Sequence, residues 1–559
     1  MGNANLVLTG MMGAGKTTVG QALAGRLGME FVDLDQEIER EAGITIRQLF
    51  DECGEARFRN LETAILQKVL HRKNQVIATG GGVVTREENL SLLKDHPVVW
   101  LAVDPGTAAR RLTFDGSRPL IKASDAAADD PEAVAEEGMA KWIRLAGERR
   151  PAYSMCDLVV NGSRPPEAVV EIIAGWWERS FSREGAGDQG AWRLEHLSVD
   201  VAEGPYLIHF GRGLLGNLGE RLRSEAGLEQ VLVVSNPTVL ALYQDEVAAA
   251  LGSAGLKWDL AVIPDGEEYK TLKTVESIYE AAFQAGLDRR SGIVALGGGV
   301  VGDIAGFAAA TYMRGVKLVQ VPTTLLAQVD SSVGGKVGVN HPRGKNLIGA
   351  FYQPVLVAAD LDTLGTLPYR EILTGMAEII KCGLIADEKL VSELEASIFK
   401  DTASAVSSDM LIHWVKAACE LKAQVVAADT KETGYREILN FGHTVGHAVE
   451  KAAGYGQYTH GEAVAIGMVT AAILSHRRGY LSRAAAERII SLIEKWGLPT
   501  RMEGLSIPAV VEACRFDKKI RSGKLRFVLL ENLGKAKLGE IVGEDELASA
   551  LEIQAGGGL

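Results

Sequence analysis

The 559-residue chain has few cysteines, no long apolar run and no excess of basic residues. Its five cysteines are scattered and form no Cys-x-x-Cys pair, which favours free thiols in a reducing cytoplasm. No apolar stretch is long enough to span a bilayer, and the first residues enter an expected strand without a secretory leader. A net charge of −13 argues against nucleic acid or an anionic membrane as the main partner. Small molecules are therefore the expected partners.

What the chain does contain is typical of a globular protein with several domains. Hydrophobic residues make up 47% and charged residues 23%, and the length is too great for one hydrophobic core. Strand-like and helix-like segments alternate at the start, which predicts an α/β module with a parallel sheet covered by helices. The same alternation resumes after a polar, glycine-containing stretch, and helical patterns then dominate. The predicted parts are an α/β module at 1–177, a linker at 178–194, an α/β subdomain at 195–360 and a mainly helical subdomain at 361–559.

A complete phosphate-binding loop stands at Gly10–Thr17, between an apolar strand and a helix start. Glycines let backbone N–H groups converge on phosphate oxygens. Lys16 can reach the β and γ phosphates, and Thr17 can hold Mg²⁺. This pattern predicts binding of a nucleoside triphosphate with Mg²⁺ by Gly13, Ala14, Gly15, Lys16, Thr17 and Thr18.

Acids and arginines follow the loop. If Phe31–Asp35 is a strand, Asp33 and Asp35 face the same side, so that one can support the metal and the other accept a proton. A glycine run, Gly80–Gly82, allows close backbone approach to a ligand. Arg118 lies in a polar stretch where it could neutralise a transferred phosphoryl group, and Arg149 offers a fork for a carboxylate.

This first module resembles shikimate kinase in its loop, its acid pair, Phe58-Arg59, Gly80–Gly82, Arg118-Pro119-Leu120 and Arg149. The resemblance implies that the nucleotide is ATP, that Asp33 supports the metal shell and that Asp35 is the base. It places Arg59, Arg149 and backbone near Gly81 around shikimate, Arg118 in a lid, and Arg111 by the adenine. A related sugar kinase would lack the arginine pair. A nucleotide-sensing regulator would not need Asp35, Arg59 and Arg149.

Three segments of the second module have features of nucleotide sites. An acidic turn can hold ribose hydroxyls, a glycine run opens an apolar helix after a strand, and a pair of threonines follows another strand. Spacing alone indicates a dinucleotide or a phosphate. The segments are Asp265, Gly266, Glu267, Glu268, Tyr269 and Lys270; Gly297–Asp303; and Thr323 with Thr324.

The chain from Asp330 to Glu462 is rich in polar residues, with many lysines near histidines. This composition predicts a substrate that carries phosphate and carboxylate groups, and a bound metal. His443 and His447 are four residues apart, so on a helix they share a face. Spacing leaves two options open: both ligate zinc, or one is a ligand and the other an acid/base group. With Glu378 and His460, a Glu/His/His metal site is plausible.

From about residue 195 onward the chain resembles 3-dehydroquinate synthase, most specifically in Leu439–Thr444 with Gly446-His447. The resemblance implies a metal, Zn²⁺ or Co²⁺, on Glu378, His443 and His460, with His447 as an acid/base group. NAD would be held by Asp265–Lys270, by Gly299, Val300, Val301, Gly302 and Asp303, by Thr323 and Thr324, and by Thr363, Leu364, Gly365 and Thr366. Substrate and catalytic positions would be Asp330, Lys336, Lys345, Asn346, Lys381, Lys422, Arg436 and Asn440, with Lys336 and Lys345 also near the cofactor. One of Lys518 and Lys519 would join them.

The implied second reaction oxidises a hydroxyl of a heptulosonate phosphate transiently, releases phosphate, returns the hydride and closes a ring to 3-dehydroquinate. NAD is thus not consumed. The alternative is a metal-dependent polyol dehydrogenase, whose substrate needs no set of lysines. The whole chain is expected to be a bifunctional cytoplasmic enzyme of the shikimate pathway. The resemblance further implies a homodimer through the second half.

Overall fold

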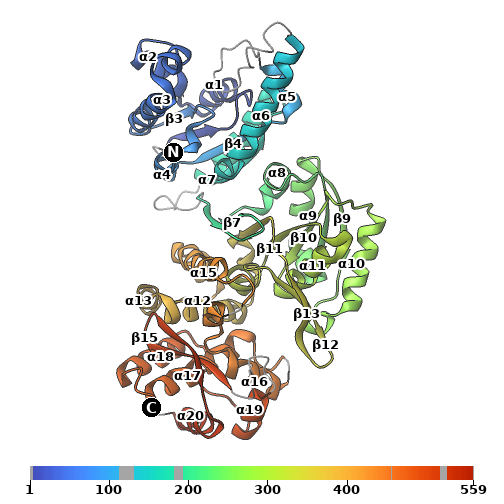
Figure 1. Cartoon of the computed structure of the whole chain (residues 1–559), viewed down its shortest axis with the longest axis vertical. Coiled ribbons are helices and arrows are strands. Elements are labelled where there is room, and N and C mark those ends of the chain that lie inside the picture. The colour runs from blue at the N-terminus through green and yellow to red at the C-terminus, as the bar shows by residue number, and fades with distance from the viewer. Residues whose placement is uncertain are drawn as a thin grey trace. The chain divides into compact units, whose positions relative to one another are not determined.

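The computed structural model describes residues 4–112, 131–181, 193–432, 434–454, 456–515, 525–557 and 559. Two compact units result. The first comprises Met1–Leu194, Leu215–Leu228 and Glu246–Leu256, and the second comprises Glu195–Leu214, Glu229–Asp245 and Lys257–Leu559. Figure 1 shows the chain coloured from blue at the amino end to red at the carboxyl end.

The first unit contains a parallel five-stranded sheet in the order β2-β3-β1-β4-β5. Helices α1 and α7 pack against each other, and the central strand β1 is fully buried, as expected for a parallel sheet covered on both faces. Its elements are β1 (Leu6–Thr9), α1 (Lys16–Leu27), β2 (Glu30–Asp33), α2 (Leu34–Ala42), α3 (Ile46–Leu70), β3 (Gln75–Ala78), α4 (Glu87–Leu93), β4 (Val98–Ala102), α5 (Pro105–Arg111), α6 (Pro131–Ser154), β5 (Leu158–Asn161), α7 (Pro166–Phe181) and α8 (Leu218–Ser224).

The second unit begins with a seven-stranded sheet in the order β6-β7-β14-β11-β10-β8-β9. All neighbours are parallel except the pair β6 and β7. The elements are β6 (Glu195–Val199), β7 (Tyr206–Gly211), β8 (Gln230–Ser235), α9 (Pro237–Ser253), β9 (Lys257–Val262), α10 (Leu272–Gln284), β10 (Gly292–Gly297), α11 (Gly299–Thr311), β11 (Lys317–Pro322), the hairpin β12 (Lys336–His341) and β13 (Gly344–Phe351), and β14 (Leu356–Asp360).

The rest of the second unit is mainly helical (Figure 1). One hydrophobic cluster joins its helices to β7 and β14, with Trp414 among its fully buried members. The elements are α12 (Tyr369–Ala386), α13 (Glu388–Ala396), α14 (Thr402–Val406), α15 (Asp409–Ala428), α16 (His443–Ala453), α17 (His460–Arg477), α18 (Arg483–Lys495), α19 (Ile507–Cys514), the hairpin β15 (Arg526–Asn532) and β16 (Lys535–Ile541), and α20 (Glu544–Gly556).

Two local predictions need correction. The strand predicted over Phe31–Asp35 ends at Asp33, whose carboxylate accepts a hydrogen bond from Asp35 N and so caps α2. Asp35 therefore lies in the first turn of a helix. Helix α7 also continues to Phe181, beyond the start expected for the linker. No helix among the described residues is long and apolar enough to cross a membrane.

Candidate active sites

The first pocket has a volume of 460 Å³ and is built by the loop between β1 and α1. Gly15 adopts a left-handed conformation, with φ of 88°, which favours glycine, and α1 starts at the next residue. Lys16 Nζ donates to the carbonyls of Gly10 (2.7 Å) and Met11 (3.1 Å). The pocket is lined by Met12, Gly13, Ala14, Gly15, Lys16, Thr17, Thr18, Val19, Asp33, Asp35, Thr79, Arg111, Gly162, Arg164 and Pro166.

The two acids reach this pocket from different elements. Asp33 Oδ2 accepts from Thr17 Oγ1 at 2.8 Å, so the hydroxyl and the carboxylate are close enough to share one cation. Asp35 enters from the first turn of α2, and a Cβ on Gly80 would lie 2.7 Å from its Oδ1. Gly80 is thus required for close approach of the backbone to this carboxylate.

A cluster of arginines and acids adjoins Gly80. Arg59 is buried and donates to Glu62 Oε2 at 2.8 Å. Burial raises the pKa of Glu62 above its ordinary value, although Arg59 opposes the shift. Arg149 Nη1 donates to Gly81 O at 2.8 Å, and the Tyr153 hydroxyl donates to the same carbonyl. The predicted residues Arg59, Gly81 and Arg149 therefore lie together.

Arg111 holds the far side of the pocket, donating to Gly162 O at 2.9 Å and Gly13 O at 3.2 Å. Arg118, predicted for a lid, lies outside the described residues. Sequence reasoning missed Arg164, which follows β5 and lines the pocket. Its place after the carboxyl end of a parallel strand was the available signal.

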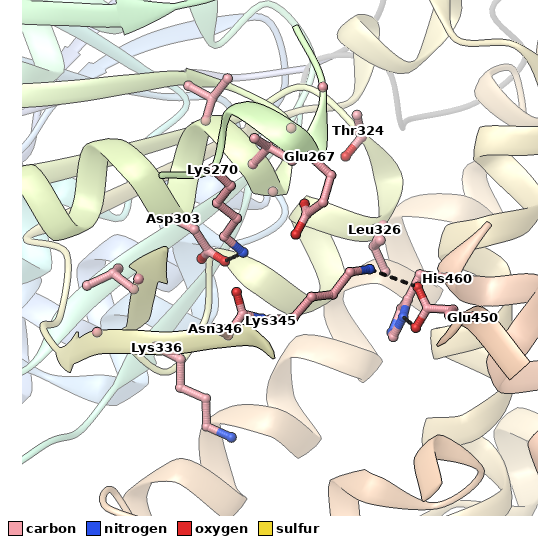
Figure 2. Close-up of a pocket in the computed structure, with 18 of the residues that line it drawn as sticks. Glu267, Lys270, Asp303, Thr324, Leu326, Lys336, Lys345, Asn346, Glu450 and His460 are labelled. Carbon is pink, nitrogen blue, oxygen red and sulfur yellow. Dashed lines mark hydrogen bonds and ion pairs between the residues drawn. The ribbon is translucent and has the colours of Figure 1, made fainter. Parts of the chain in front are cut away.

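The second pocket has a volume of 1540 Å³ and lies in the second unit. Figure 2 shows Lys270, Asp303 and Glu267 on one side and His460 with Glu450 on the other. Of the predicted residues, its lining includes Asp265, Gly266, Glu267, Lys270, Gly299, Val300, Val301, Asp303, Thr323, Thr324, Lys336, Lys345, Asn346, Thr366, Asn440, His447 and His460.

The dinucleotide end of the pocket is built by strand ends and a helix start. Lys270 Nζ contacts Asp303 Oδ2 at 2.5 Å, which links the acidic turn to α11. Burial raises the pKa of Asp303, although Lys270 opposes the shift. Gly298 follows β10 and precedes α11, which starts at Gly299, and the first N–H groups of a helix are suited to bind an anion. Leu364, another residue predicted to hold NAD, is fully buried in the turn after β14.

Three groups converge at a possible metal centre. Glu378 Oε1 lies 3.6 Å from His443 Nε2 and 3.8 Å from His460 Nε2. This carboxylate oxygen is buried and has no hydrogen-bond partner among the described residues. The three side chains can offer ligand atoms within 4.8 Å of one another. A divalent cation fits this arrangement of one carboxylate and two imidazoles.

Glycines set the spacing of the two histidines. His443 is the first residue of α16, after Gly442 with φ of 79°, and His460 is the first residue of α17. A Cβ on Gly467 of α17 would overlap Gly442 O and lie 3.0 Å from Gly446 N. The two helices therefore pack backbone to backbone beside the site.

A second acid, Glu450, touches the same site. Its Oε2 lies 3.5 Å from His460 Nδ1, and its Oε1 lies 3.4 Å from Lys345 Nζ (Figure 2). Burial would lower the pKa of His460, but Glu450, Glu378 and Asp330 together outweigh it and raise the pKa. Glu450 was not predicted. Its position seven residues after His443, on the same face of α16, was a usable signal.

The other lysines and the arginine predicted for the second substrate site contact carboxylates or backbone carbonyls. Lys381 contacts Glu378, Lys422 contacts Asp330, and Lys336 lies 2.8 Å from Glu432. Burial alone would raise the pKa of Asp330, but Lys422 and Lys381 outweigh it and lower the pKa well below its ordinary value. Arg436 is buried and donates to the carbonyls of Thr430 and Gly334. Lys518 and Lys519 lie outside the described residues.

Protein-family models match both modules of the chain. A model of shikimate kinase matches residues 12–175. Models of the N-terminal and C-terminal parts of 3-dehydroquinate synthase match residues 260–374 and 375–520.

Individual proteins are also similar to the second module of the chain. A 3-dehydroquinate synthase from Pelotomaculum thermopropionicum is 53% identical over 344 residues, 61% of this chain and 92% of the relative. A solved 2-epi-5-epi-valiolone synthase from Streptomyces hygroscopicus subsp. jinggangensis, with NAD⁺ and Zn²⁺ bound, is 30% identical, with a TM-score of 0.58 over 63% of this chain and 97% of that one. A solved 2-deoxy-scyllo-inosose synthase with carbaglucose-6-phosphate, NAD⁺ and Co²⁺ is 29% identical, with a TM-score of 0.59 over 65% of this chain and 100% of that one.

The two sites thus define a fusion of a phosphate-loop kinase with a dinucleotide- and metal-site enzyme. The chain belongs to the 3-dehydroquinate synthase family and has a shikimate kinase module at its amino end. It is a bifunctional enzyme of the shikimate pathway with a kinase and a lyase activity, as predicted. The family matches favour the synthase over the polyol dehydrogenase alternative.

Proposed function

We propose that the first pocket transfers the γ-phosphoryl group of ATP to the 3-hydroxyl of shikimate. Lys16 exchanges its carbonyl partners for phosphate oxygens, and Thr17 with Asp33 holds Mg²⁺. Asp35 accepts the hydroxyl proton, because it enters the same pocket and stands beside Gly80. Arg59 and Arg149 bind the shikimate carboxylate. The observation that carries this assignment is the convergence of Asp35, Arg59 and Gly81 next to the phosphate loop.

The second pocket, in our proposal, converts 3-deoxy-D-arabino-heptulosonate 7-phosphate to 3-dehydroquinate and phosphate. Glu378, His443 and His460 hold Zn²⁺ or Co²⁺, and the lining from Asp265 to Thr366 holds NAD. The unpartnered, buried Glu378 Oε1 facing two imidazole nitrogens carries the metal assignment. When bound, the metal supplies Lewis acidity and NAD supplies reversible hydride transfer.

The chain's own residues bind and orient the substrate. Lys336, Lys345, Asn346 and Arg436 present cations and an amide to phosphate and carboxylate. Buried Lys381 and Lys422, with the partly exposed Asp330, form a charged group beside the metal ligands. His447 lines the pocket on the helix face that carries His443 and can move a proton there. Asn440 precedes that helix and also lines the pocket.

The kinase assignment is tested by Asp35→Asn. Loss of a positioned base lowers the turnover of shikimate phosphorylation by about 10²–10⁴-fold. ATP consumption should be proportional to shikimate in the unaltered chain, measured by ADP release. The exposed Asp51, changed to Asn, is the matched control. Full kinase turnover in the Asp35 variant would remove it as the base.

The metal site is tested by His460→Ala. This variant should lose bound metal and phosphate release together and keep full kinase turnover, as measured by elemental analysis and by the two assays. The exposed His413, changed to Ala, should lose neither. Retained metal in the His460 variant contradicts the ligand set. Net accumulation of NADH by the unaltered chain contradicts the synthase reaction, since the hydride returns to the product.

We place both reactions in the cytoplasm, where ATP and NAD are available, and we expect a homodimer through the second half. Light scattering of the whole chain tests the dimer.

A further inference from the structure

The edge of the kinase sheet is covered by a segment from beyond the linker. Strand β5 pairs with β4 on one side only, and its other side would expose unpaired N–H and C=O groups. Asn217, at the start of α8, fills this position. Its Nδ2 donates to Val159 O at 2.8 Å and its Oδ1 accepts from Val159 N at 3.0 Å. One side-chain amide thus takes the place of a neighbouring strand's peptide.

Helix α8 adds a buried arginine to this contact. Arg221 is fully buried, and its Nη2 donates to Cys156 O at 2.9 Å and Asp157 O at 3.3 Å, the residues leading into β5. Its Nη1 contacts Oε1 of Glu225, the residue that caps the end of α8, at 2.6 Å, which neutralises the charge locally. Separating α8 from β5 would leave this buried cation without its carbonyl acceptors, which is energetically costly. The contact therefore stabilises the first unit.

The same helix reaches the nucleotide pocket through one ion pair. Arg164, which follows β5 and lines the first pocket, donates to Glu220 Oε1 of α8 at 2.6 Å and to the Ser253 carbonyl of α9. The Glu220 side chain is 10% exposed. Both partners of Arg164 lie in 215–228 and 246–256, which belong to the first compact unit. Neither segment falls in the residues matched to shikimate kinase.

We propose that residues 215–228 are part of the functional kinase. They cover the edge of the sheet at β5, and Glu220 is a positioning residue that holds Arg164 in the nucleotide pocket. The kinase therefore does not end at the linker. Its nucleotide affinity depends on helix α8, which follows the linker and lies within the subdomain predicted at 195–360. This inference rests on the kinase function proposed above.

The first test measures kinase kinetics in the full chain. Glu220→Gln should raise the KM for ATP about two- to tenfold, with kcat and the KM for shikimate little changed, because Arg164 loses its charged partner but the reacting groups are untouched. Glu171→Gln, an exposed ion-pair partner on α7, is the control of equal charge. Synthase turnover should be unchanged, since no residue of 215–228 lines the second pocket. An ATP KM equal to that of the control overturns the role of Glu220.

The second test does not depend on catalysis. Arg221→Met should speed amide hydrogen exchange in β5, because its contacts with Cys156 and Asp157 are lost. Arg223→Met is matched to it, since Arg223 is on the same helix but donates to Ala254 O instead. Equal exchange in the two variants overturns the closure of the sheet by α8. A chain that never phosphorylates shikimate would refute the proposed function, while this exchange experiment would still decide the contact.

Discussion

The lysines of the second site contact carboxylates, whereas Lys16 of the kinase pocket donates to backbone carbonyls. In the kinase pocket, Lys16, Arg111 and Arg149 donate to neutral backbone carbonyls. In and beside the synthase pocket, the lysines contact carboxylates: Lys270 with Asp303, Lys336 with Glu432, Lys345 with Glu450, Lys381 with Glu378 and Lys422 with Asp330. A neutral carbonyl is easily exchanged for a phosphate oxygen. A carboxylate holds its lysine more firmly, and its own charge needs a partner when the lysine leaves.

This difference predicts that cations of the second pocket also stabilise the fold. Lys381→Met leaves the Glu378 carboxylate buried without its cation, since the two side chains are 2% and 3% exposed. We expect the free energy of unfolding around α12 to fall by about 3–5 kcal/mol in the metal-free chain. Native-state hydrogen exchange of α12 measures it.

Added Zn²⁺ should recover part of that loss, because the ion supplies the missing positive charge. The exposed Lys389, changed to Met, should shift stability by no more than about 0.5 kcal/mol. An equally small change in the Lys381 variant would remove the contrast between the pockets.

In the kinase pocket the corresponding change should affect catalysis alone. Lys16→Met removes a cation from the developing phosphoryl charge and should lower kinase kcat by about 10²–10³-fold. Stability should change by less than about 0.5 kcal/mol, because the Gly10 and Met11 carbonyls that lose a donor are neutral. Turnover assays and thermal unfolding measure both. The exposed Lys68, changed to Met, is the control. Marked destabilisation of the Lys16 variant would contradict the proposed difference between the lysines of the two sites.

A smaller, pH-dependent effect is expected at Asp157, which accepts hydrogen bonds from Val98 N and Leu194 N. Burial raises its pKa from 3.8 to about 7. The folded state therefore keeps a proton that the unfolded chain loses, and stability falls as pH rises from about 4 to about 7. Thermal unfolding of the first unit across this range should show the decline. Asp157→Asn should flatten it, and an unchanged slope would exclude Asp157 as its source.

Much of both sites could be predicted from sequence because the decisive residues are close together along the chain. The phosphate loop lies between a strand and a helix, and His443 begins a helix that also carries His447. Such short-range patterns fix local backbone geometry.

What could not be predicted depends on contacts between distant segments. Glu432 was missed because only the fold brings it to Lys336, and the contact of Glu450 with Lys345 also joins segments that are distant in sequence. Asp35 was placed on a strand because capping by Asp33 competes with the strand pattern, and the cap prevails. No local signal links Asn217 to β5, which is 58 residues away in sequence.

The backbone contact between α16 and α17 has a consequence for how activity can be lost. Because Gly467 leaves no room for a side chain against Gly442, even an alanine there would push apart the two helix starts that bear His443 and His460. A random search for chains unable to retain zinc should therefore recover changes at a glycine that coordinates nothing, alongside changes at the ligands themselves.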